Sequence, residues 1–365
     1  MQNQPAKSPG IKEIASALGI SIATVDRAFH NRPGVNATTR DRILKMAAKL
    51  GYRPNVAARA LKLNRRLRIG VQLPLEIASF FDPLGEGIRA ATDAMFGVDL
   101  DINFSTYPRL GSGDIDLLHA ALKEKYDGLI CTPGDAAKAD PMIRELGRNG
   151  TAVICVASDA PRSERLASVS IDGYISGSLA AELLSHTLLV PGTVATITGA
   201  LRTLDHAEKL RGFAATIALV APHLSLLPVL ESHDNPEEAY HQARNLLKSH
   251  PELRGLYIST ANSLPVLRAV REHGQLGRLR IITTDLFEEL LPMLETGEVL
   301  ATLYQRPFTQ GKTAAELLLR FLVEGMRPNS TMRLAPHIVL RSNASHFARY
   351  LGAAHSLTSD TTKPV

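Results

Sequence analysis

Apolar positions near the start of the chain recur at helical spacing in three short segments. The first stripe covers Ile11–Leu18 and ends at Gly19, because glycine adopts the left-handed backbone that stops a helix. Ser21 is a good N-cap for a second helix over Ile22–Phe29, and residues 36–50 form a third helix that Asn36 can cap. The stripe of the third helix consists of Ile43, Leu44, Ala47 and Leu50.

The second of these helices has two unlike faces. Its inward face holds Val25, Ala28 and Phe29, and its outward face holds Ile22, Ala23, Asp26 and Arg27. Two short helices around a glycine turn make a helix-turn-helix, whose second helix enters the major groove of DNA. An ordinary helical hairpin would show the same two-helix pattern, so the rest of the chain has to decide between the two readings.

From Leu67 onward, strands alternate with helices. The run LRIGVQL is a continuously apolar strand of the kind that parallel sheets bury on both faces. The pattern predicts two doubly wound α/β lobes, the second beginning near Ala167, with connections between them near residues 157–165, 304–307 and 332–335. It also predicts one strand over residues 224–230 and a helix over residues 84–95.

Composition narrows the class of protein. The 365 residues exceed the usual size of one domain, and no apolar run is long enough to span a bilayer. The polar start MQNQPAKSPG lacks the apolar core of a signal peptide, so we expect a cytoplasmic protein without a membrane partner. Cys131 and Cys155 each fall in a predicted core strand and are expected to be small buried hydrophobes rather than a disulfide or a metal pair.

Charge is distributed unevenly along the chain. Residues 1–68 contain 14 Lys and Arg against 3 Asp and Glu, which leaves 27 basic and 33 acidic residues for the remainder. The head therefore carries a net charge of +11 and the body −6. A basic head on an acidic body is typical of a phosphate-binding module attached to a module that does not bind nucleic acid.

The order of these features closely resembles the headpiece of LacI/GalR-family transcriptional regulators. The residues that carry the match are Ile14-Ala15, Gly19-Ile20-Ser21, Ala23-Thr24-Val25, Arg27, Val35, Thr39-Arg40, Leu50-Gly51-Tyr52-Arg53-Pro54-Asn55, Ala58-Arg59 and Leu61. The resemblance implies an all-α headpiece followed by a type I periplasmic-binding-protein-like core of two doubly wound α/β lobes. The implied boundaries are a disordered start (1–10), the headpiece (11–54), a hinge helix and linker (55–66), the effector-binding and dimerisation domain (67–345) and a tail (346–365).

The resemblance also implies which residues meet DNA. Arg27 would read guanine directly, and Ile22 and Ala23 would offer apolar contact to a base edge. Asp26 departs from the family's small hydroxyl residue, and it could accept from a cytosine amino group, orient Arg27, or simply face solvent. Phosphate contacts are expected from Ser21, Thr24, Asn31, Thr38 and Arg40, and hinge contacts from Asn55, Ala58 and Leu61, although the hinge segment could also be a plain linker.

The carboxyl ends of the predicted strands give the candidate effector site, because open α/β sheets bind ligands there. The side chains selected by this rule are Phe80, Phe81, Asp135, Asp159, Asn262, Asp285 and Gln305. Each of these residues could instead have a purely structural role, at the end of a strand or as a helix cap. The resemblance adds Lys209, which stands where the family usually has an effector-clamping arginine, and His206 one turn earlier; this substitution leaves a phosphorylated or acidic sugar open as the effector.

These features predict a sequence-specific DNA-binding regulator, a repressor that binds a palindromic operator as a homodimer and responds to a small sugar-like effector between its lobes. The alternative is a periplasmic-type solute-binding protein without a DNA-binding role, which would lack the basic headpiece. The sequence contains no His-Glu-x-x-His, Cys-x-x-Cys or nucleophile-elbow motif, so no enzyme, catalytic residue, metal or cofactor is predicted.

Overall fold

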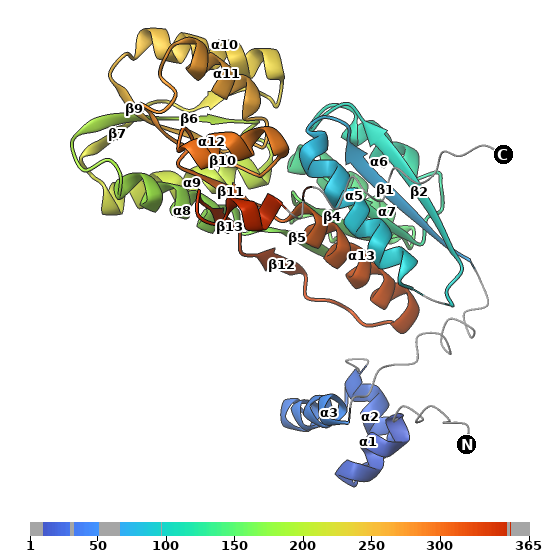
Figure 1. The fold of residues 1–365 in the computed structure, drawn as a ribbon. Coiled ribbons are helices and arrows are strands. Elements are labelled where there is room, and N and C mark those ends of the chain that lie inside the picture. Colours follow the sequence, from blue (N-terminus) through green and yellow to red (C-terminus); the bar gives the residue numbers. More distant parts are fainter. Residues whose placement is uncertain (1–9, 30–32, 51–65, 96, 349–350, 352–365) are drawn as a thin grey trace, which may run out of the picture.

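The computed structural model describes residues 10–29, 33–50, 66–95, 97–348 and 351. Three helices form the headpiece (Figure 1), namely α1 (Ile11–Leu18), α2 (Ile22–Phe29) and α3 (Ala37–Lys49). The predicted end signals are confirmed. Gly19 has a φ of 64°, the Ser21 hydroxyl accepts from the Thr24 amide at 3.0 Å, and the Asn36 side chain accepts from the Thr39 amide at 2.7 Å.

Ile14, Val25 and Ile43, one from each helix, are fully buried and form the centre of the headpiece core. Leu44 was predicted to belong to this core, but 46% of it is exposed. Met46 packs against the core instead. The three-helix packing, rather than periodicity within α3 alone, determines which side of that helix turns inward.

Among the described residues, six strands form the sheet of the first lobe, in the order β12-β5-β4-β3-β1-β2 with every pair parallel. The strands are β1 (Leu67–Pro74), β2 (Leu100–Tyr107), β3 (Gly128–Cys131), β4 (Ala152–Val156), β5 (Ala167–Ile171) and β12 (Thr331–Leu334). The helices of this lobe are α5 (Ala78–Asp93), α6 (Asp114–Ala121), α7 (Ala136–Arg148) and α13 (Pro307–Glu324).

The second lobe has a sheet in the order β13-β11-β10-β9-β6-β7, with β8 also paired to β6. Its strands are β6 (Gly192–Thr198), β7 (Leu224–Leu226), β8 (Leu230–Glu231), β9 (Leu253–Ile258), β10 (Arg280–Thr284), β11 (Ala301–Tyr304) and β13 (His337–Val339), which alone among these described strands runs antiparallel to its neighbour. Its helices are α8 (Gly173–Ser185), α9 (Leu204–Val220), α10 (Pro236–Ser249), α11 (Leu264–Glu272) and α12 (Leu291–Thr296), with a 3₁₀ turn at Glu288–Leu290.

The connections between the lobes differ in one place from the prediction. Strand β5 was assigned to the second lobe, but it pairs in parallel with β4 and β12 of the first lobe. The chain therefore crosses at Asp172, between β5 and α8, and the predicted crossing at residues 157–165 is wrong. The crossing at residues 304–307, between β11 and α13, is confirmed, and the last crossing follows β12 at residues 335–336.

Two predicted elements also change. The helix expected at residues 84–95 begins six residues earlier, so Phe80 and Phe81 lie in its first turns rather than in a loop. The strand expected at residues 224–230 divides into β7 and β8 on either side of Pro228, which has no amide hydrogen to donate to a sheet. Cys131 and Cys155 are free, buried as predicted, and paired in register across β3 and β4.

Glycines allow two helix pairs to pack at very short range. A Cβ at Gly87 of α5 would lie 2.0 Å from the Phe308 carbonyl oxygen of α13, and a Cβ at Gly177 of α8 would lie 1.8 Å from the Lys209 carbonyl oxygen of α9. Only glycine permits that approach. The second contact fixes α9 against its neighbour at the residue that the sequence had singled out as an effector ligand. Nowhere in the described ranges does a helix have the length and apolar character needed to span a membrane.

Candidate functional site

The outward face of α2 is exposed to solvent. Ile22 is 49% exposed, Ala23 and Arg27 are exposed, and Asp26 is half-buried. This face lies opposite the buried Val25 and Ala28, as the helical spacing requires. On such a face the arginine can donate to a base edge, and the two small or apolar side chains can contact a thymine methyl group.

The expected phosphate ligands stand in different positions. The Ser21 hydroxyl is engaged at the α2 N-terminus, where it also lies 2.8 Å from the Thr24 hydroxyl. Thr38 is exposed near the start of α3, and Arg40 is half-buried with a buried Nε that has no partner among the described residues. The remaining predicted contacts lie outside the described residues: Asn31, Asn55, Ala58 and Leu61.

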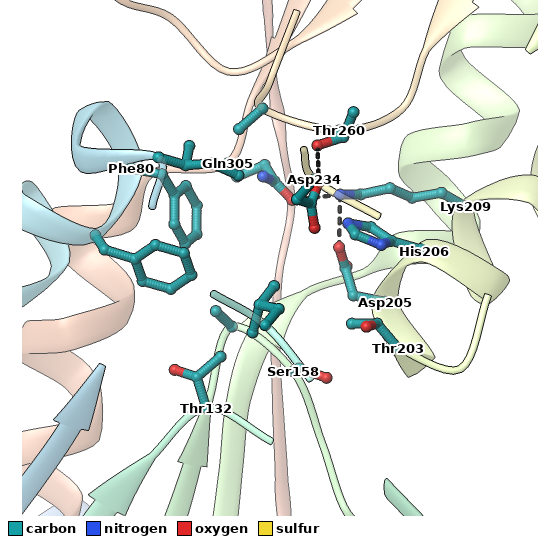
Figure 2. Close-up of a pocket in the computed structure, with 15 residues that line it drawn as sticks. Phe80, Thr132, Ser158, Thr203, Asp205, His206, Lys209, Asp234, Thr260 and Gln305 are labelled. Atoms are coloured by element: carbon teal, nitrogen blue, oxygen red, sulfur yellow. Dashed lines mark hydrogen bonds and ion pairs between the residues drawn. The ribbon is translucent and has the colours of Figure 1, made fainter. Parts of the chain in front are cut away.

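A cavity lies between the two lobes at the carboxyl ends of their strands (Figure 2). It offers about 40 Å³ of space to the centres of water molecules. Five of the nine predicted effector residues line it: Phe80, Phe81, His206, Lys209 and Gln305. The other lining residues are Ile77, Leu110, Thr132, Ala157, Ser158, Thr203, Asp205, Asp234, Thr260 and Ala261.

The two walls of the cavity are chemically unlike. The first lobe contributes an aromatic wall, in which the Phe80 and Phe81 rings meet edge to face with centroids 4.9 Å apart, and both are almost fully buried. The second lobe contributes most of the hydrogen-bonding and charged groups. A ligand between these walls would stack its apolar face on the rings and direct its polar groups at the second lobe.

Lys209 organises the polar wall. Its ammonium group lies 2.6 Å from Asp205 Oδ2 and donates to Gln305 Oε1 at 2.7 Å, and the side chain is 1% exposed (Figure 2). Gln305 continues the network, because its side-chain amide and its backbone amide both donate to the carboxylate of Asp285. The direction of donation is thus fixed from Lys209 through Gln305 to Asp285.

Asp285 lies behind the cavity wall and is buried. Burial raises the pKa of Asp285 to about 6, although the hydrogen bonds from Gln305 and the charge of Lys209 act to lower it. Asp285 was predicted to contact the effector, but its position instead supports the orientation of Gln305.

His206 and Asp234 complete the polar wall on either side of Gly199. His206 Nδ1 lies 3.0 Å from the Ala200 amide nitrogen and 3.3 Å from the Ala200 carbonyl oxygen, so the backbone of Ala200 holds the ring in place. The Thr260 hydroxyl donates to Asp234 Oδ1 at 2.5 Å. A Cβ at Gly199 would collide with both the His206 ring and the Asp234 carboxylate, so glycine is required for these two side chains to meet.

Besides Asp285, three predicted effector residues lie outside the cavity lining. Arg165 binds the carboxylate of Asp159 with two nitrogens, and the Ser168 hydroxyl donates to it at 3.0 Å, so Asp159 ties the loop after β4 to β5. Asp135 caps α7 by accepting from the Lys138 amide. Asn262 borders a neighbouring hollow, not this one.

The sequence did not single out Asp205, Thr203 or Asp234 as ligands. Asp205 had a detectable signal, because it lies four residues before Lys209 on a helix and that spacing favours an ion pair. Asp234 follows β8, a strand too short to recognise from its pattern. Ile77, Ala157 and Asp234 all have φ between 52° and 62°, a strained backbone for non-glycine residues that is concentrated at functional sites.

The fold and the two sites define a class: proteins that couple a helix-turn-helix headpiece to a two-lobe ligand-binding domain. The sequence profile of bacterial regulatory proteins of the lacI family matches residues 10–55, and that of a periplasmic binding protein domain matches residues 69–325. The chain belongs to the LacI family, and it is a DNA-binding transcription regulator with a sugar-binding-type domain. The family and fold class predicted from the sequence are thereby confirmed.

Several relatives are similar over most of their length. Catabolite control protein A of Priestia megaterium is 23% identical over 91% of this chain and 98% of its own. The ribose operon repressor of Bacillus subtilis is 26% identical over 85% and 90%. A glucose-galactose binding protein from Geobacillus stearothermophilus superposes with a TM-score of 0.69 and 26% identity over 76% of this chain and 99% of its own. A solute-binding protein from Agrobacterium vitis bound to α-D-tagatopyranose has a TM-score of 0.72, 18% identity and coverage of 78% and 99%.

Proposed function

We propose that the chain is a repressor that binds a palindromic operator as a homodimer and is controlled by a sugar in the cavity between its lobes. One observation carries the proposal, namely that two features occur in the same chain. The first is a helix whose outer face is exposed and differs in composition from its buried face, and the second is an inter-lobe cavity with one aromatic and one polar wall. Relatives named as repressors support the direction of control, and solved structures of similar fold with bound sugars support the ligand class.

The short length of α2 supports a homodimer. One α2 helix can present only a few side chains to the major groove, whereas two copies related by a two-fold axis read two half-sites. Arg27 is the residue that we expect to discriminate between bases, since its guanidinium can donate twice to guanine. Ser21, Thr24, Thr38 and Arg40 would set the position of the headpiece on the phosphates.

The size of the cavity supports control by opening and closing. Pockets that bind small molecules typically have volumes of roughly 300–1,000 Å³, whereas this cavity has a volume of about 40 Å³. A sugar can enter only if the lobes separate about their crossings at Asp172 and at residues 304–307 and 335–336. Ligand binding therefore has to select a lobe arrangement, and that arrangement sets the geometry of the two headpieces.

The test is selection of binding sites by the full chain from a random duplex pool, followed by footprinting and measurement of stoichiometry. We expect two chains on a short near-palindrome. Arg27→Ala should lower the ratio of affinities for selected and scrambled duplex by about 10- to 100-fold while salt-sensitive background binding remains. Arg42→Ala removes the same charge from the exposed surface of α3 and should leave that ratio unchanged.

Two results would reject this function. A solute-binding protein without a DNA-binding role would enrich no sequence and protect no fragment. A non-specific DNA binder would protect every fragment equally, with identical ratios for the wild type and Arg27→Ala. For the effector, neutral sugars should change the affinity for the selected duplex, and a broad panel without any effect would remove the cavity from the mechanism.

A further inference from the structure

The polar wall contains a carboxylate that the Lys209 network does not neutralise. Asp234 lines the cavity and is 2% exposed. Its carboxylate accepts from the Thr260 hydroxyl at 2.5 Å, and no second donor reaches it from any residue that the structure describes. A buried carboxylate with one neutral donor is incompletely solvated, so it favours any ligand that supplies further donors.

The backbone holds this carboxylate in place at a cost. His233 and Asp234 are consecutive non-glycine residues with φ of 50° and 52°, in the left-handed region. Asn235 follows directly and caps α10 by accepting from the amides of Glu237 and Glu238, so Asp234 is not needed to cap that helix. Its strained conformation and its position in the cavity lining are therefore not explained by the helix start.

The groups around Asp234 do not balance the negative charge of its carboxylate. The ammonium of Lys209 is already paired with Asp205 at 2.6 Å, and none of the residues that the structure describes forms an ion pair with Asp234. Burial raises the pKa of Glu76 nearby, the charge of Arg109 lowers it and the charge of Asp234 raises it. Glu76 is itself a carboxyl group, so it adds negative rather than positive charge near Asp234.

We propose that Asp234 is the specificity-determining residue of the cavity, and that it selects polyols without anionic groups while rejecting sugar acids and sugar phosphates. The inference rests on the proposed function of the cavity as the effector site. A ligand hydroxyl or amino group donates to the open oxygen of Asp234, whereas a carboxylate or phosphate meets a fixed negative charge that has no ion-pair partner among the residues that the structure describes. Lys209 does not make the cavity an anion site, because Asp205 already neutralises it.

The experiment uses isothermal titration of the full chain with matched pairs of sugars. Suitable pairs are D-ribose with D-ribose 5-phosphate, D-galactose with D-galacturonate, and D-glucose with D-glucose 6-phosphate. In the wild type we expect the anionic member of each binding pair to bind at least about 100-fold more weakly than its neutral partner. Asp234→Asn keeps an acceptor for Thr260 but removes the charge, so it should narrow that ratio by about 10-fold or more.

Glu237→Gln is the matched control, since it removes one negative charge three residues away on the exposed start of α10. It should leave the ratio unchanged. An anionic sugar that binds the wild type as well as its neutral partner would overturn the selectivity and leave the effector site intact. An equal ratio in the wild type and Asp234→Asn would overturn the role of Asp234.

Binding by no member of any pair at about 10 mM would instead reject the cavity as a sugar site, and the proposed effector control would fail with it. If Asp234→Asn does not fold, as judged by circular dichroism, the wild-type ratios alone decide the ligand class. The role of Asp234 is then tested with Thr260→Val, which removes its one hydroxyl donor and should weaken neutral ligands without favouring anions.

Discussion

The ion pair between Lys209 and Asp205 offers a sharp test of how the cavity is built. Its atoms are 2.6 Å apart, with the lysine side chain 1% exposed and the aspartate side chain 11% exposed. Three variants define a double-mutant cycle: Asp205→Asn, Lys209→Met and the combination of the two. The cycle isolates the pairwise energy from the other contacts that each side chain makes.

The structure gives the expected magnitudes. Lys209→Met leaves the Asp205 carboxylate without its cation and Gln305 Oε1 without its donor, and breaking a buried pair in this way costs roughly 3–5 kcal/mol. Asp205→Asn removes the charge but keeps an acceptor for the ammonium, which still donates to Gln305, so about 2 kcal/mol is expected. The double variant leaves no unpaired charge and should cost about 3 kcal/mol, well below the sum, which implies a coupling of roughly 2–4 kcal/mol.

The assay is urea unfolding of the full chain followed by far-ultraviolet circular dichroism. The chain contains no tryptophan, so the usual fluorescence probe is absent, and tyrosine emission can serve as the second signal. The m-values of all four proteins should agree, which checks that the same surface is exposed on unfolding. A coupling energy below about 0.5 kcal/mol would show that the two side chains contribute independently, and the reasoning about a neutralised Lys209 would fail.

Two further predictions concern the surroundings of that pair. Because the pKa of Asp285 is raised to about 6 from an ordinary 3.8, its ionised form destabilises the fold above that pH, by roughly 3 kcal/mol at pH 7, and this cost disappears as the pH falls from about 6 toward 3.8. The difference in unfolding free energy between the wild type and Asp285→Asn should therefore shift by about that amount between roughly pH 7 and pH 4, and a constant difference would contradict the buried, perturbed carboxyl. Gly177→Ala would place a methyl group 1.8 Å from the Lys209 carbonyl oxygen, so it should lower stability by roughly 2–4 kcal/mol and weaken sugar binding by displacing α9, whereas Gly147→Ala, with no atom within 4 Å, should be stable. Thermal melts and titrations of these two glycine variants with the same sugars would check this, and equal melting temperatures would argue against the close contact.

Several cavity residues were accessible from sequence, but the neighbours that each side chain meets were not. His206 and Lys209 share a face of α9, and both line the cavity. The strand-end rule also found Phe80, Phe81 and Gln305. It placed Asp159 at the ligand as well, but Arg165 binds that carboxylate, since a strand end determines where a side chain begins and not which neighbour it meets.

Asp234 shows the limit most clearly. It follows a two-residue strand, and only its left-handed backbone and the absence of a side chain at Gly199 bring it to the cavity. Gln305 lies 96 residues from Lys209 in sequence, so the hydrogen bond between them requires the assembled second lobe. Neither the position of Asp234 nor the hydrogen bond between Lys209 and Gln305 produces a periodic pattern in the sequence.

By itself, the sequence determined the headpiece, its caps, the alternation of strands and helices, and the family. Those features depend on residues a few positions apart, where spacing and backbone preference decide the outcome. The tertiary structure decided that β5 completes the first lobe, that Lys209 is paired with Asp205 within the cavity, and that Asp234 lines the cavity. These outcomes depend on hydrogen bonds and charges between distant segments, and only the packing of both lobes specifies which groups meet.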